Sequence, residues 1–89
     1  MADEIRDNFT YLSNEYAQAL QAFSTIQEKA ATLLLLGGTD DLLAFIEQFL
    51  AMASRTKAMA EDMKEPNFAD WFGELIEKAE ALRAAVPQR

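Results

Sequence analysis

The chain has 89 residues, of which 51% are hydrophobic and 26% charged, and its formal net charge is −7. This composition is that of one folded domain, residues 1–89, with a small core. The absence of Cys and His excludes disulfides, thiolate chemistry, and the commonest general base and transition-metal ligand. The negative charge opposes contact with phosphate backbones and anionic lipids, so we expect neither a nucleic-acid nor a membrane partner.

The first nine residues, MADEIRDNF, are acidic and lack the apolar region of a signal peptide. The leucine run Leu33–Leu36 is far shorter than the roughly 20 apolar residues that span a bilayer. We therefore expect a cytoplasmic protein.

The first predicted element is a helix over about residues 4–36. Asp3 and Glu4 suit the positive end of a helix dipole, and Gly37-Gly38 suits a left-handed helix stop. Between them, apolar residues follow a 4-3 spacing that places them on one helix face. They are Ile5, Phe9, Leu12, Tyr16, Ala19, Phe23, Ile26, Ala30 and Leu33.

A second helix is predicted over about residues 40–64, with Thr39 as its N-cap and Asp40 and Asp41 in its first turn. It carries two neighbouring apolar stripes. The first is Leu42, Phe45, Phe49, Met52, Thr56, Met59 and Met63, and the second is Leu43, Ile46, Leu50, Ala53, Lys57 and Ala60. A helix that is apolar over so wide a face needs neighbours on two sides.

The third predicted helix covers about residues 67–86. Pro66 disfavours helix for the residue before it, and Asn67 with Asp70 resembles a capping box. The apolar positions are Phe68, Phe72, Leu75, Ala79, Leu82 and Val86. Gly73 within this helix indicates close approach by a neighbouring helix or an aromatic ring.

The fold class predicted from these elements is all-α, because no strand-like alternation occurs. The two-glycine turn makes the first two helices a long antiparallel hairpin, and the short KEPN connection folds the third helix back onto it. The result is a three-helix bundle, completed by dimerisation. If Pro66 only kinks the chain, the third helix projects toward another chain instead.

Two features predict a covered surface. The four leucines Leu33–Leu36 point in every direction around the helix axis, and the span Asn8–Gln27 contains a single charged residue, Glu15. Interface cores are depleted in charge in the same way. The candidate interface residues are Tyr11, Tyr16, Leu34, Leu35, Leu36, Leu43, Ile46, Leu50 and Trp71.

No catalytic, cofactor-binding or metal-binding residues are predicted. The acidic pairs Asp40-Asp41 and Glu61-Asp62 are explained by the helix dipole and by a solvated surface, and the Ser and Thr residues have no base beside them. The basic segment Ser54–Lys57 is expected to pair with acids on a neighbouring helix.

We therefore expect a non-enzymatic helical interaction or adaptor module that self-associates, as a homodimer, and presents a helical face to an unidentified protein partner. One alternative is a small acidic inhibitor (an immunity, antitoxin-like or phage anti-defence protein) that docks on a basic site. Another is a helical bundle that binds a small molecule among Phe23, Phe45, Phe49 and Met52.

Overall fold

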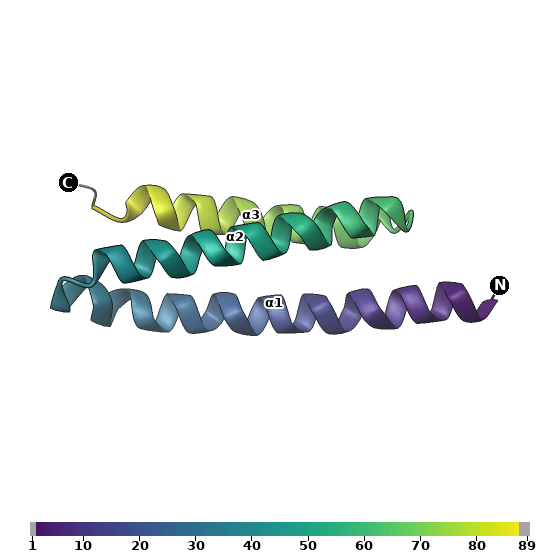
Figure 1. Ribbon diagram of the computed structural model, residues 1–89, viewed down its shortest axis with the longest axis horizontal. Helices are drawn as coiled ribbons and strands as arrows, with labels where there is room; N and C mark the ends of the chain where they lie inside the picture. Colours follow the sequence, from purple (N-terminus) through teal and green to yellow (C-terminus); the bar gives the residue numbers. More distant parts are fainter. Residues whose placement is uncertain (1, 88–89) are drawn as a thin grey trace.

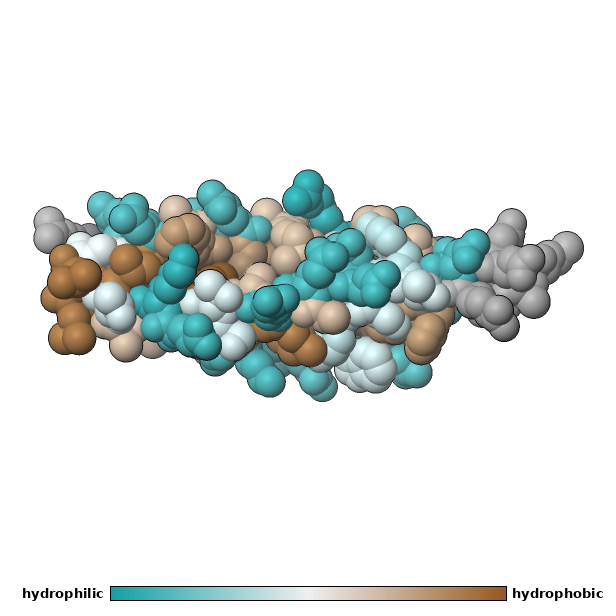
Figure 2. All heavy atoms as spheres, turned by 90° about the horizontal axis from the view of Figure 1, so that it is seen from below, coloured by the Kyte–Doolittle hydropathy of each residue, from teal (hydrophilic) through white to brown (hydrophobic). Residues whose placement is uncertain are grey.

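A computed structural model describes residues 2–87 of the chain, with side chains from residue 7 onward. It contains three α-helices: α1 (Ala2–Leu36), α2 (Thr39–Asp62) and α3 (Pro66–Ala85). They form a three-helix bundle with no strand in the described residues, so the all-α prediction is confirmed (Figure 1). The molecule is a rod of 52 × 17 × 15 Å (Figures 1 and 2).

The turn between α1 and α2 stops the first helix at the glycine pair, as predicted. Gly37 adopts a φ of 78°, and the Gly38 N–H donates to the carbonyl of Leu33 at 2.7 Å. These are the geometry and the long-range bond of a Schellman motif.

The predicted N-cap of α2 is wrong by one residue. The cap is Gly38, whose carbonyl accepts the Leu42 N–H at 3.0 Å, and Thr39 is already the first helical residue. No side chain caps this helix, while Asp40 and Asp41 do lie in its first turn.

The turn between α2 and α3 is a second Schellman motif, formed without glycine. Lys64 has a φ of 59°, the Glu65 N–H donates to the carbonyl of Ala60 at 2.9 Å, and the Lys64 N–H donates to that of Glu61 at 3.1 Å. α2 therefore ends at Asp62, two residues earlier than expected.

α3 begins at Pro66, where the missing N–H of proline costs no helical bond. The capping box expected at Asn67 is wrong, since the N-cap is Glu65 and no side chain caps the helix. α3 folds back beside α2 rather than projecting onward (Figure 1).

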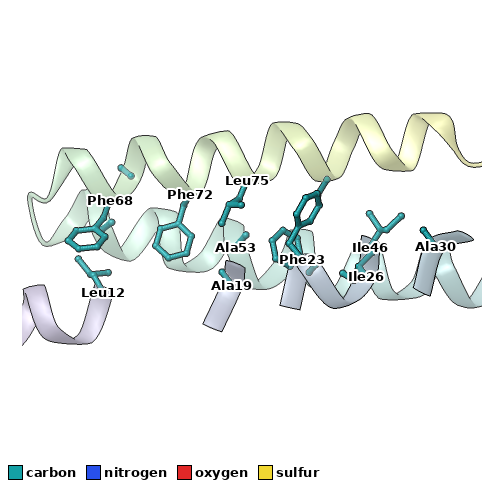
Figure 3. Close-up of a cluster of buried hydrophobic side chains, with 14 of the residues drawn as sticks. Leu12, Ala19, Phe23, Ile26, Ala30, Ile46, Ala53, Phe68, Phe72 and Leu75 are labelled. Carbon is teal, nitrogen blue, oxygen red and sulfur yellow. The ribbon is translucent and has the colours of Figure 1, made fainter. Parts of the chain in front are cut away.

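The core runs along the axis of the rod, between the three helices (Figure 3). α2 packs most extensively against α3 and next against α1, whereas α1 and α3 touch least. The buried residues of α2 are Leu42, Ile46, Phe49, Ala53, Thr56 and Ala60. They come alternately from the first and the second predicted stripe. This is because α2 packs against both α1 and α3, so the line between the two stripes faces the core.

Two smaller features complete the core. The hydroxyl of Thr56, a buried polar side chain, donates to the carbonyl of Met52 at 3.0 Å, which satisfies it within the helix. At Gly73, an added Cβ would contact only the Lys57 side chain, at an ordinary 3.6 Å. The prediction that a neighbouring helix or an aromatic ring approaches unusually closely at Gly73 is therefore wrong.

Candidate interaction surface

The last turn of α1 ends in exposed leucines, Leu34, Leu35 and Leu36, which we call the leucine tip. Leu33 packs against the core, but Leu35 is 87% exposed and Leu36 78% exposed. Because α1 stops at Gly37, no further turn of the helix covers them. Figure 2 shows hydrophobic side chains gathered at this end of the rod, on the left of the view.

A groove lies between α1 and α2, and none of the residues that line it comes from α3. It consists of two adjoining hollows of about 370 and 450 Å³, open to solvent on one side. The first is lined by Ala22, Thr25, Ile26, Lys29, Phe45, Gln48, Phe49 and Met52, and the second by Glu28, Lys29, Thr32, Leu33, Asp41 and Phe45. We call these residues together the hairpin groove.

The floor and the rim of the hairpin groove differ in burial. Phe49 forms the floor, is almost fully buried, and has its ring centroid 5.5 Å from that of Phe23. Phe45 stands at the rim and is 40% exposed. The Lys29 Nζ lies 5.5 Å from the Phe45 ring centroid, so a cation–π contact separates the two hollows.

An aromatic cluster joins α1 to α3 along their sparse contact. The Trp71 ring lies 5.1 Å from Phe68 and 5.5 Å from Tyr16, and Phe9 lies 5.5 Å from Phe68, all between centroids. These distances are typical of favourable aromatic pairs. Trp71 nevertheless remains 42% exposed.

The candidate interface residues fall into three groups. Tyr11, Leu34, Leu35, Leu36 and Trp71 are exposed, whereas Tyr16, Leu43 and Leu50 are half-buried against the core. Ile46 is fully buried within the chain. Its position on the second stripe of α2 faces the centre of the bundle, so it does not belong to the outer surface.

Within residues 7–87, three exposed large hydrophobic residues were not among the candidates: Phe9, Leu20 and Phe45. Phe9 and Phe45 occupy regular core-type positions, so the helical period assigned them to the interior. Phe9 is 56% exposed because the N-terminal end of α1 reaches beyond the connection between α2 and α3 (Figure 1). The signal available in the sequence was the unequal length of the predicted helices, which requires one to overhang.

Charged groups make few contacts with one another. Within residues 7–87 the one ion pair joins the Lys57 Nζ to the Glu61 Oε1 at 3.7 Å, on the same helix. The expectation that the basic segment pairs with a neighbouring helix is therefore wrong for Lys57.

No group of three or more Asp or Glu residues in the described part of the chain is arranged to hold a metal ion. No helix in that part is both long and apolar enough to cross a membrane.

Comparisons of the chain with protein-family models, with curated proteins and with solved structures found no match.

Proposed function

We propose that this chain is a non-enzymatic helical interaction module that self-associates, as a homodimer, through its leucine tip. The observation that carries the proposal is the exposure of two consecutive leucines, Leu35 and Leu36, at the end of a folded rod. Burying one leucine side chain stabilises an assembly by about 1.5–3 kcal/mol relative to leaving it in water. A second copy that covers both Leu35 and Leu36 gains this free energy for each of the two side chains.

The total surface of the chain supports the same proposal. Its accessible area is 6150 Å² for a mass of 10.0 kDa, whereas a compact monomer of that mass exposes about 5,200 Å². The difference is close to the roughly 800 Å² that each partner buries in a standard interface. The excess follows from the rod shape, because a body of 52 × 17 × 15 Å exposes more surface than a sphere of the same volume.

The outer side of α1 is suited to a further protein partner. Between Asn8 and Gln27 its exposed positions are neutral and Glu15 is the one charged residue. Such a face loses little charge solvation when another helix covers it. We propose that α1 presents this face once the tip is occupied.

The direct test is the mass in solution at micromolar concentration, by sedimentation velocity or light scattering. We expect a species of twice the 10.0 kDa chain mass. The double substitution Leu35→Glu and Leu36→Glu should dissociate it and leave the helical circular dichroism unchanged, because both side chains are exposed.

The matched control places the same two charges elsewhere. Ala44→Glu and Ala51→Glu alter exposed alanines of α2, and the dimer should persist in this variant. A wild-type chain that stays monomeric, or a control that dissociates equally, would contradict the proposal.

Binding of a small apolar molecule is a second candidate, favoured by the hairpin groove, which contains Phe45, Phe49 and Met52. Self-association has the stronger support, because ligand pockets enclose 70–90% of a small molecule and this groove is open along one side. A titration with an apolar fluorescent dye tests it: saturable binding of one dye per chain that Phe45→Ala abolishes would favour a ligand site.

The acidic-inhibitor alternative has less in its favour. An inhibitor of that kind docks through one dense acidic face. The Asp and Glu residues of this chain are distributed over all three helices.

A further inference from the structure

We infer that the leucine tip of one copy occupies the hairpin groove of a second copy, and the reverse, in a two-fold antiparallel dimer. The inference rests on the proposed self-association and adds to it the surface that receives the tip. It assigns the knob to Leu36 and the hole to the hollow between Thr25 and Phe45.

The knob and the hole lie on one stripe of α1. Ala22, Lys29 and Leu36 follow one another at intervals of seven residues, which brings them within about 20° per step of the same direction. Ala22 and Lys29 line the groove, so the helical period places Leu36 on the same side of α1, one turn beyond the lining residue Leu33. The position of Leu36 is therefore on the side of α1 that carries the hollow.

This arrangement complements itself under a two-fold axis. Leu36 and Thr25 are 11 positions apart in the sequence, or about 16 Å along the helix axis. If a second α1 runs antiparallel and the axis crosses midway, between Lys29 and Thr32, each Leu36 meets the partner's Thr25. An isologous interface requires this kind of pairing, in which one patch supplies both the projection and the cavity.

The hollow offers a leucine an apolar setting. Ala22, Ile26, Phe45, Phe49 and Met52 line it, with Thr25 and Gln48 as the neutral polar residues and Lys29 as the charged one. The hydroxyl of Thr25 already donates to the carbonyl of Gln21 at 3.0 Å, so covering it leaves no donor unsatisfied.

Charges of both signs lie beside the axis. Lys29 forms no ion pair within residues 7–87, and Glu28 and Asp41 line the same half of the groove. Along the helix axis, Lys29 of one copy lies about 6 Å from Glu28 and about 4.5 Å from Lys29 of the other copy. Each lysine therefore gains a carboxylate and a like charge as neighbours, and the apolar contact of Leu36 supplies the attraction.

Cysteine cross-linking tests the geometry directly, because the chain has no Cys of its own. An equimolar mixture of Leu36→Cys and Thr25→Cys chains, treated with a short bis-maleimide, should give a mixed dimer as its main product, identified by mass. Thr32→Cys alone should cross-link to itself, since it lies near the axis. Leu36→Cys alone and Thr25→Cys alone should react far less, because equivalent residues are about 16 Å apart. Glu80→Cys, on exposed α3 surface, measures random collision.

The outcomes separate this inference from the proposed function. A wild-type monomer in solution contradicts both. A dimer in which Leu36→Cys reacts mainly with itself shows that the tips meet each other, which overturns the docking and leaves self-association intact. A dimer without the mixed product also overturns the docking.

A second measurement uses two aromatic residues of nearly equal exposure. Phe45→Glu places a charge in the groove and should raise the dimer dissociation constant by about tenfold or more, as expected for a central interface residue. Trp71→Glu places the same charge on the aromatic cluster and should leave that constant unchanged while the chain stays helical. Phe45 is 40% and Trp71 42% exposed, so an equal effect of the two would contradict the inference.

Discussion

α2 contacts both α3 and α1 with residues that follow the same helical period. The two contacts differ in how completely they are closed. The first is the most extensive in the bundle, and it joins two helices whose buried residues include Ala53 and Ala60 on α2 and Ala69 and Ala79 on α3. The second has bulky residues at its edge, Phe45, Met52 and Lys29, and keeps an open groove. Spacing decides which residues face a neighbour, and side-chain size decides how closely that neighbour approaches.

The largest expected effect contrasts the floor and the rim of the groove. Phe49→Ala should lower the free energy of unfolding by about 3–5 kcal/mol, because the side chain is almost fully buried against Phe23. Phe45→Ala should lower it by about 1 kcal/mol or less, since the half-exposed ring fills no enclosed space. Urea denaturation of both variants under conditions that keep the chain monomeric measures the difference. Equal losses would mean that the groove is part of the closed core.

Overpacking tests how tightly the bundle is packed around the buried alanines of α2. Ala60→Leu should destabilise the fold by about 1–3 kcal/mol, because the site is fully buried and the neighbouring helix must move to admit the larger side chain. Ala58→Leu, on the exposed side of the same helix, is the matched control and should change stability by less than about 0.5 kcal/mol. A neutral Ala60→Leu variant would show unfilled space around Ala60.

The two turns use the same motif with different residues at the left-handed position, so opposite substitutions should have opposite signs. Lys64→Gly should stabilise the chain by about 1 kcal/mol, because glycine adopts a positive φ without the Cβ clash. Gly37→Ala should destabilise it by about 1 kcal/mol for conformational reasons alone, since an added Cβ meets no atom within 4 Å. Thermal unfolding should show shifts of opposite direction.

The smallest effect concerns the one glycine inside a helix. Gly73→Ala should stabilise α3 by about 0.5–1 kcal/mol, because the new methyl group would make an ordinary contact with Lys57 and alanine favours helix. Calorimetry should record a higher midpoint. A lower one would show that the helices approach more closely at Gly73 than a 3.6 Å contact allows.

Much of the architecture was predictable from local signals. The first helix ends at Leu36 as expected, because two consecutive glycines leave the helix no good continuation. The apolar spacing identified the core faces of α1 and α3, including Leu12, Phe23 and Phe72. The helix N-caps were harder to predict. Thr39 and Asn67 have good capping side chains, but the N-caps are Gly38 and Glu65, because the helical backbone begins before those side chains.

The candidate surface was predictable only in part. The exposed leucines were recognised because a full turn of apolar residues cannot face a single core. Ile46 and Phe45 were misassigned between core and surface because both stripes of α2 are mainly apolar near these residues. Their roles depend on where α1 and α3 lie around the helix, and periodicity within one helix carries no information about that direction.

The sequence alone determined the local features of this protein: three helices, two turns, the apolar faces, and a leucine turn too broadly apolar for one helix to cover. These depend on residues within a few positions of one another, where spacing, glycine and proline act directly. The tertiary structure decided between a returning and a projecting α3, and it decided the extensive contact between α2 and α3 and the open groove beside α1. Those features depend on which side chains meet across helices, and such meetings are set by the size and direction of residues far apart in the chain.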